Sequence, residues 1–143
     1  MRRRFLERNT PPAWNARALT EDDFWRFCQV AGVTVYFRPM ERLGFFTNLN
    51  GRPTIYIRDT LSGFDRAFTL WHEMGHFWLH PPGIQFFHGY DSLVETEADV
   101  VAACALIPRP MILHYWDSEL IDLHGFPTDL IELRRSIYSL WGI

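Results

Sequence analysis

The spacing of hydrophobic and polar residues predicts a helix near the start of this chain. In the stretch LTEDDFWRFCQVAG, residues 19–32, the apolar side chains recur at intervals of three and four, as on one face of an amphipathic helix. Thr20 and Asp23 occupy the two positions of a capping box, and Gly32 is a typical helix stop. We therefore expect a helix that begins after Thr20 and ends at Gly32.

The pattern then changes from helical spacing to strict alternation, which predicts strands. Residues 33–38, VTVYFR, alternate apolar and polar side chains, and residues 43–49 and 53–58 are two further short segments of strand type. Between the last two lies Asn50-Gly51, the dipeptide most typical of a tight hairpin turn. We expect a small antiparallel sheet of about three strands.

The second part of the chain predicts helices. Helical spacing covers a segment from residue 62 or 65 to His80, followed by residues 93–107, 110–123 and 127–140, with prolines near the boundaries. Pro11-Pro12 blocks a helix, and we expect residues 1–18 to be an irregular lead-in. The sequence thus predicts the α+β class, with a small sheet packed on a helical core, in a single domain over residues 1–143.

Composition narrows the classes of function. A hydrophobic content of 48% and an aromatic content of 16% are typical of a globular domain. A net charge of −3 argues against direct binding of nucleic acid. No apolar run reaches the roughly 18 residues of a membrane span, and no apolar segment of a signal peptide follows the first arginines, so we expect a cytoplasmic protein. Cys28 and Cys104 lie among apolar neighbours and are expected to be buried thiols.

The segment FTLWHEMGHFWLH, residues 68–80, carries the chemistry. His72 and His76 are four apart and therefore share one helix face, where two imidazoles can bind one metal ion. Glu73 is rotated by about 100° from His72, so it can lie beside the ion and take a proton from water. Two histidine ligands and an adjacent glutamate base are the functional groups of the H-E-x-x-H motif, and this motif predicts zinc-assisted hydrolysis.

A catalytic zinc site usually has three protein ligands, so a further ligand is needed. His80 is two turns from His72 and cannot easily reach the same ion, whereas His88, in a loop, could. The helix VETEADVVAACALIP, residues 94–108, is a better source of the third ligand. Its carboxylates Glu95 and Asp99 are four apart, so one can bind the metal while the other accepts a hydrogen bond from a ligand histidine. Glu97 projects elsewhere, and we expect it to be solvated.

These two segments together resemble the ImmA/IrrE family of metallopeptidases, whose motifs are similar to HELGHxxLH and ExEANxFAxxLLMP. Met74, Asp99 and Val101 stand where the family has Leu, Asn and Phe. The resemblance covers residues 33–108 well and the last helices loosely. It implies a zincin-like core in which the small sheet packs on the H-E-x-x-H helix and the downstream glutamate helix. It also implies His72, His76 and Glu95 as metal ligands and Glu73 as general base. With Glu95 as the ligand, the spacing of four leaves Asp99 to accept the hydrogen bond from a ligand histidine.

The resemblance further implies a zinc-dependent endopeptidase with one Zn²⁺ per chain, although the same ligands can hold Mn²⁺ or another divalent ion. The implied substrate is a protein, a helix-turn-helix repressor in stress or mobile-element regulation. Candidates for contacts with the oxyanion or the substrate are His88, Tyr90, His114 and Tyr115. The strand TIYIR, residues 54–58, precedes the motif helix, and we expect it at an edge of the sheet where a substrate could pair.

Two other interpretations remain open from the residues. A non-catalytic anti-repressor or toxin–antitoxin module could keep the metal site without turnover, but such a module has no need of Glu73. A structural zinc site is typically rich in cysteine with four protein ligands, whereas neither cysteine of this chain is near the motif. Exchange of Glu73 for glutamine distinguishes a binder, which keeps its function, from a protease, which loses it.

Overall fold

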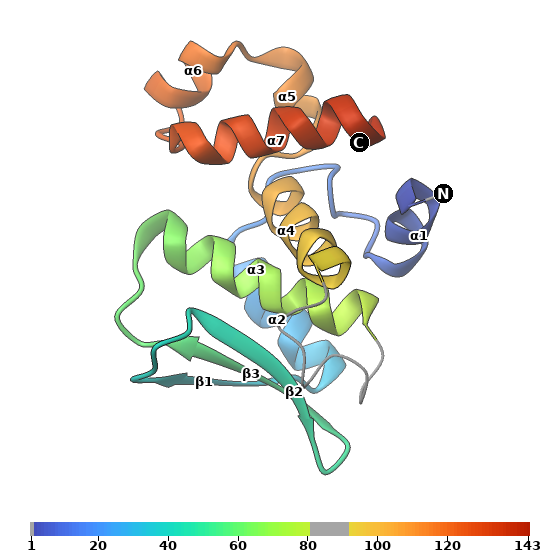
Figure 1. The fold of residues 1–143 in the computed structure, drawn as a ribbon, viewed down its shortest axis with the longest axis vertical. Coiled ribbons are helices and arrows are strands. Elements are labelled where there is room, and N and C mark those ends of the chain that lie inside the picture. Colours follow the sequence, from blue (N-terminus) through green and yellow to red (C-terminus); the bar gives the residue numbers. More distant parts are fainter. Residues whose placement is uncertain (1, 81–91) are drawn as a thin grey trace. The chain divides into compact units, whose positions relative to one another are not determined.

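The computed structural model describes residues 2–80 and 92–143, which form helices and one small sheet (Figure 1). Two compact units are present, Thr20–Ala102 and Met1–Leu19 with Ala103–Ile143. The helices are α1 (Arg2–Asn9), α2 (Glu21–Ala31), α3 (Gly63–Leu79), α4 (Ser92–Leu106), α5 (Arg109–His114), α6 (Asp117–Asp122) and α7 (Thr128–Trp141). The strands are β1 (Thr34–Arg38), β2 (Gly44–Leu49) and β3 (Arg52–Arg58). The expected α+β class is confirmed.

The sheet is mixed rather than antiparallel, which corrects one expectation. Its strand order is β1-β3-β2, with β2 antiparallel and β1 parallel to β3. The Asn50-Gly51 turn gives the expected hairpin of β2 and β3, because both residues take the positive φ angles, 52° and 77°, that tight hairpins require. Alternation along β1 marks it as a strand but says nothing about its partner, so the direction of pairing could not be read from the sequence.

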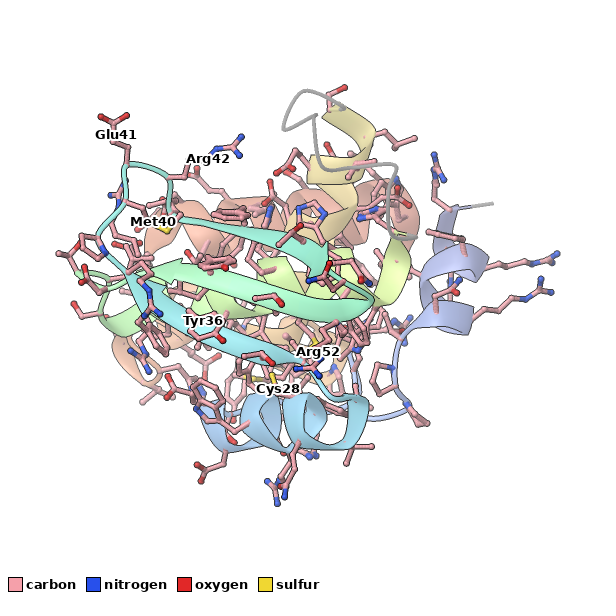
Figure 2. All side chains as sticks on the ribbon, turned by 90° about the horizontal axis from the view of Figure 1, so that it is seen from below. Cys28, Tyr36, Met40, Glu41, Arg42 and Arg52 are labelled. Atoms are coloured by element: carbon pink, nitrogen blue, oxygen red, sulfur yellow. The ribbon has the colours of Figure 1, made fainter. Side chains whose placement is uncertain are left out.

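The same order corrects the expected edge strand. β3 lies in the centre, and its Ile55 and Ile57 are fully buried. Among the described residues β2 is the edge strand that follows the turn at Met40, Glu41 and Arg42 (Figure 2). Adjacency in sequence to the motif helix was the wrong criterion, because a strand's place in a sheet depends on its pairing partners on both sides.

Helix α3 packs on one face of the sheet, against β2 and β3, and also contacts α2 (Figure 1). Trp71 of α3 is buried and meets Phe24 of α2 edge to face, with 5.5 Å between the ring centroids. The capping box of Thr20 and Asp23 starts α2, and Gly32 ends it in the left-handed conformation, as expected. These contacts hold α3 firmly, and α3 carries the H-E-x-x-H motif.

Figure 2 looks onto the opposite face of the sheet, where Tyr36 of β1 is labelled. Its ring stacks on Tyr56 of β3 at 5.5 Å, and Tyr56 stacks on Phe45 of β2 at 4.6 Å. This row of aromatic rings crosses all three strands, and such cross-strand pairs stabilise a sheet by about 0.2–1 kcal/mol each. The sheet therefore offers α3 a rigid support.

A glycine sets the closeness of α3 and α4. A side-chain carbon added at Gly75 would lie 2.9 Å from Cβ of Val101 and 3.2 Å from Cα of Ala98. Both distances are shorter than ordinary van der Waals contact, so only glycine fits without displacement. The two helices that carry the candidate ligands thus approach each other at Gly75, one residue before His76.

The other unit differs from expectation at two places. Residues 2–9 form α1 rather than an irregular lead-in, with Leu6 fully buried as its anchor. The helix expected over residues 110–123 is divided into α5 and α6, because Tyr115 and Trp116 are extended. The Arg135 guanidinium donates to the carbonyls of Ile112 and Tyr115, which compensates the backbone bonds lost at this break.

No helix within residues 2–80 and 92–143 combines the length and the apolar character that crossing a membrane requires. Cys28 and Cys104 are buried free thiols, as expected.

Candidate metal centre

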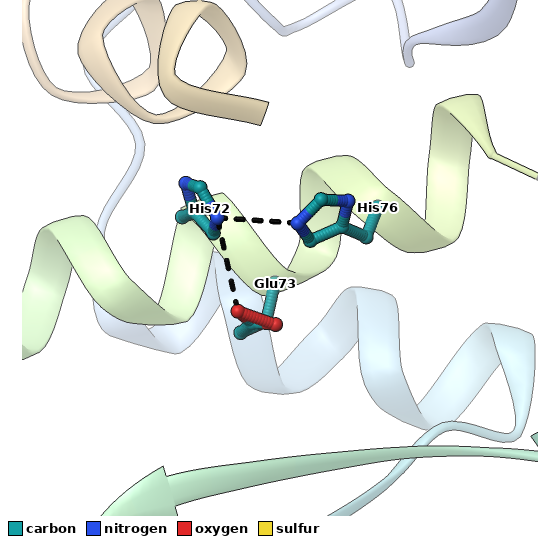
Figure 3. Close-up of side chains that lie close together, drawn as sticks. All are labelled: His72, Glu73 and His76. Atoms are coloured by element: carbon teal, nitrogen blue, oxygen red, sulfur yellow. Dashed lines mark hydrogen bonds and ion pairs between the residues drawn. The ribbon is translucent and has the colours of Figure 1, made fainter. Parts of the chain in front are cut away.

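Three side chains of α3 form the starting point of the site (Figure 3). His72 and His76 lie one helical turn apart, and their Nε2 atoms are 3.2 Å from each other. Ligand atoms of His72, Glu73 and His76 all lie within 4.8 Å of one another, a spacing that could hold a metal ion. The i, i+4 spacing of the sequence thus brings both imidazoles to one point, as expected.

Glu95 of α4 approaches the same point. Its Oε2 lies 3.0 Å from His72 Nε2, and its Oε1 lies 3.3 Å from His76 Nε2. Ligands placed 2.0–2.1 Å from a tetrahedral zinc ion are separated from one another by about 3.3 Å. The three donor groups therefore have the mutual spacing that three ligands of one zinc ion require.

Asp99, one turn after Glu95 on α4, lies behind His72. Its Oδ1 is 2.8 Å from His72 Nδ1. A carboxylate at this distance accepts the Nδ1–H hydrogen bond, which leaves the lone pair of Nε2 directed at Glu95 and His76. Two nitrogen lone pairs and a carboxylate then face one another, and a cation between them removes the repulsion. The donor set therefore fits zinc.

The same contacts determine the charges of the metal-free site. Burial lowers the pKa of His72, but hydrogen bonds to Asp99 and Glu95 outweigh burial and raise it to about 10. Hydrogen bonds from His72 and His76 hold the pKa of Glu95 far below its usual range. In the absence of metal, a proton on His72 therefore occupies the place that a cation would take.

Glu73 lies beside this donor set rather than within it. Its Oε1 is 3.8 Å from His72 Nε2, which is farther than the 3.0 Å from that nitrogen to Glu95 (Figure 3). Glu95 therefore completes the more compact set of ligand atoms, and Glu73 remains available for proton transfer. Glu73 is only 3% exposed, and its Oε2 has no hydrogen-bond partner among the described residues.

The surroundings of Glu73 favour its neutral form in the metal-free chain. Burial raises the pKa of the Glu73 carboxyl, while the positive charges of the two histidines and of Arg42 oppose this rise. Gly44, the first residue of β2, lies directly against it, since an added side-chain carbon there would be 3.2 Å from Glu73 Cγ. The edge strand thus begins beside the candidate base.

A comparison with protein families decides the family of this site. The model of peptidase family M78, the IrrE N-terminal-like domain, matches residues 28–130. The chain belongs to this family. The suspected ImmA/IrrE membership is thereby confirmed, and the M78 match includes α3 with its motif and the whole of α4. Neither a curated protein nor a solved structure matches the chain.

Membership of peptidase family M78 indicates a peptidase that depends on a metal, in general zinc, and therefore a protein substrate. Of the expected M78 site residues, the structure brings together His72, Glu73, His76, Glu95 and Asp99. His88 and Tyr90 lie outside the described residues. Tyr115 belongs to the other unit, which includes Ala103–Ile143. The centroid of its ring lies 4.7 Å from that of His114 and 4.8 Å from that of His124.

The prediction for Glu97 was wrong, and a contact of His80 was not predicted from the sequence. Glu97 was expected to be solvated but is only 3% exposed, and its Oε1 lies 3.6 Å from Nε2 of the buried His80. His80 in turn places Nδ1 at 2.9 Å from His76 Nδ1. The i, i+4 spacing of His76 and His80 was visible in the sequence, but it was judged only for direct reach to the metal.

Proposed function

We propose that this chain is a zinc-dependent endopeptidase that cleaves a protein substrate. The observation that carries the proposal is the set of three donor groups, 3.0–3.3 Å apart, with a buried glutamate beside it. Family membership supports the peptidase class. The proposal treats residues 1–143 as one functional domain, because the family match includes residues of both units.

The roles of the residues follow from their positions. His72, His76 and Glu95 would hold the ion, and Asp99 would fix the ring of His72. A bound zinc ion supplies Lewis-acid polarisation of a carbonyl and lowers the pKa of water toward neutrality. Mn²⁺ or another divalent ion can bind the same ligands, so the choice of metal in the cell rests on availability.

Glu73 would act as general base and then as general acid. Its Oε atoms take a proton from the attacking water as oxygen bonds to the scissile carbonyl carbon, and the carboxyl then delivers that proton to the leaving amide nitrogen. The C–N bond breaks, so that one water is consumed for two new chain ends. A buried carboxylate whose Oε2 has no hydrogen-bond partner among the described residues is suited to this role, because burial raises its affinity for a proton.

The edge of β2 provides a place for an extended substrate. The Arg58 amide donates to the carbonyl of Leu43 directly opposite, and the alternation of an antiparallel ladder then applies along β2. By that alternation the N–H and C=O groups of Gly44, Phe46 and Asn48 turn away from β3. A substrate strand that paired with them would pass Glu73, because Gly44 lies against its side chain.

For the identity of the substrate, the support is the resemblance to the ImmA/IrrE family. We propose a DNA-binding repressor with a helix-turn-helix domain, cleaved in the cytoplasm to release genes of a stress response or a mobile element. The chain itself would make no direct contact with nucleic acid, in keeping with its net charge of −3.

The deciding experiment incubates the zinc-loaded protein with purified helix-turn-helix repressors and identifies fragments by mass spectrometry. The matched control is Glu73→Gln, which keeps the shape of the side chain and removes the base. New peptide ends with wild type alone support the endopeptidase. Equal loss of repressor DNA binding with both proteins, without fragments, supports instead a non-catalytic anti-repressor module.

A further inference from the structure

The two histidines of the donor set differ in what lies behind them. His72 meets a carboxylate directly, since its Nδ1 is 2.8 Å from Asp99 Oδ1. His76 meets another histidine, with its Nδ1 2.9 Å from Nδ1 of His80. Nε2 of His80 then lies 3.6 Å from Oε1 of Glu97. Each histidine of the donor set is thus connected to a carboxylate of α4, one directly and one through a second imidazole.

Metal binding by His76 would fix the direction of its hydrogen bond to His80, while the 3.6 Å between His80 and Glu97 is the distance of an ion pair rather than of a hydrogen bond. If His76 Nε2 is to offer a lone pair to a metal, its proton must be on Nδ1, because a neutral imidazole carries only one. That proton can be donated only if His80 Nδ1 accepts it, so the proton of His80 is on Nε2. This N–H faces Glu97, which as a carboxylate is purely an acceptor. This placement of protons agrees with the His76–His80 hydrogen bond and directs the N–H of His80 toward the carboxylate of Glu97.

Because His80 and Glu97 are buried, the placement of their protons affects stability. His80 is 8% exposed and Glu97 is 3% exposed, and a buried carboxylate is costly unless a donor or a charge compensates it. The backbone holds both in place, since His80 is the C-cap of α3 and its N–H donates to the carbonyl of His76. Glu97 lies on α4 between Glu95 and Asp99, in a helix that Gly75 allows close to α3.

We propose that His80 and Glu97 are positioning residues that orient His76 for metal binding. We call these two residues together the relay. Glu97 polarises His80, and His80 accepts the Nδ1–H of His76, which fixes the tautomer of that ligand and increases the basicity of its Nε2. This inference rests on the proposed metal site, but it concerns residues that neither bind the ion nor touch the substrate. In this arrangement α4 provides one ligand, Glu95, and also a carboxylate behind each ligand histidine.

The first test measures zinc affinity by competition with a chromophoric chelator for wild type, His80→Ala and Glu97→Gln. Removal of such an outer partner typically weakens metal binding by 10–100-fold. We expect about tenfold for Glu97→Gln, which keeps shape but loses charge, and more for His80→Ala. In the double variant the Glu97 exchange should cost nothing further, because its effect passes through His80. Independent, multiplying losses would contradict the relay.

The control for general damage is Leu79→Ala, which removes a buried neighbour of His80 outside the relay. We expect Leu79→Ala to lower the melting temperature but to leave the zinc affinity within about twofold of wild type. If zinc affinity instead falls in proportion to melting temperature across all variants, the residues serve only packing and the proposal is overturned.

An NMR measurement can distinguish a positioning role from a role in packing alone, because it reports directly on the proton of His76 Nδ1. In zinc-loaded, ¹⁵N-histidine-labelled wild type, the His76 Nδ1–H proton should give a downfield NMR signal protected from exchange with water. We expect the signal to move upfield in Glu97→Gln and to disappear in His80→Ala, while Leu79→Ala retains it. An unchanged signal in Glu97→Gln would contradict the role of that carboxylate.

The failure of this proposal can be told apart from failure of the metal site itself. Wild type that binds zinc, together with relay variants of wild-type affinity, overturns the relay and leaves the endopeptidase proposal standing. Wild type that binds no zinc overturns both.

Discussion

The contact between His72 Nδ1 and Asp99 Oδ1, at 2.8 Å, joins the motif helix to the glutamate helix at the candidate metal centre. Asp99 holds the ring so that Nε2 points at Glu95, 3.0 Å away. This hydrogen bond between α3 and α4 holds the ligand side chains in place before any metal binds. The free-energy cost of ordering them on metal binding is therefore smaller.

We therefore expect Asp99→Ala to weaken zinc binding by about 10–100-fold. Asp99→Asn should weaken it less, because the amide oxygen can still accept from His72 Nδ1. Competition with a chromophoric chelator measures both constants. Equal losses in the two variants would show that the charge of Asp99 matters more than its hydrogen bond, and would contradict its role as the acceptor that orients His72.

Exchange of Glu73 for glutamine should separate chemistry from stability. We expect hydrolysis to fall by about 10²–10⁴-fold, the range typical for loss of a general base. Zinc content should stay unchanged, because Glu73 lies outside the compact donor set. The melting temperature of the metal-free protein should stay equal or rise, since the exchange removes a buried carboxylate whose Oε2 lacks a hydrogen-bond partner among the described residues. Calorimetry and metal analysis of one preparation check these outcomes, and a loss of zinc would contradict the assignment.

Gly75 should not tolerate even a methyl group. Because the added carbon would lie 2.9 Å from Val101 Cβ, Gly75→Ala should lower the free energy of unfolding by about 1–3 kcal/mol and weaken zinc binding. Val101→Ala removes the side chain that the added methyl group would meet. The further loss of stability and of zinc affinity caused by Gly75→Ala should therefore be smaller in the Val101→Ala background than in wild type. Urea unfolding of the four proteins gives the cycle, and strictly additive losses would contradict the close contact of α3 and α4 at this point.

Because the thiol of Cys28, labelled in Figure 2, is buried, we expect the protein to lose stability in alkali. Burial raises the pKa of Cys28 from 9.0 to about 12, so the folded state keeps the thiol protonated where the unfolded chain ionises it. The contribution is fully present below pH 9 and is lost as pH rises toward 12. Between about pH 8.5 and 10.5 we expect wild type to lose about 2 kcal/mol more than Cys28→Ala in urea unfolding. Parallel slopes for the two proteins would contradict a role of this thiol in the loss.

The edge strand gives a prediction about substrate binding. Asn48→Pro removes an N–H that points away from β3, so the sheet should persist while pairing with a substrate strand is lost. We expect a rise in KM of about tenfold, whereas Asn48→Ala, which keeps the N–H, should resemble wild type. Steady-state kinetics on a cleaved repressor, with circular dichroism as the check on folding, measures the difference. Wild-type KM in Asn48→Pro would show that the substrate does not pair there.

Local signals in the sequence predicted the elements well. The capping box at Thr20, the Asn50-Gly51 turn and the spacing of His72 and His76 each depend on residues close in the chain, and each appears as expected. The approach of Glu95 and Asp99 to His72 was also accessible, because their spacing of four places both on one helix face.

Features that depend on tertiary partners could not be read in this way. The parallel pairing of β1 with β3, which makes β3 central, depends on how the connections run in space. The burial of Glu97 depends on what α4 packs against, and a single carboxylate in a helix gives no sign of that. The break at Trp116 is stabilised by Arg135 from a distant helix, so the local helical pattern was misleading there.

The central claim is that His72, His76 and Glu95 bind one zinc ion, and the most direct test is metal content per chain. Wild type and Glu95→Ala, purified side by side and exposed to zinc, are analysed by native mass spectrometry. We expect about one zinc per wild-type chain and a sharp loss in the variant. Equal zinc in both proteins would contradict Glu95 as the third ligand, and no zinc in wild type would contradict the metal centre altogether.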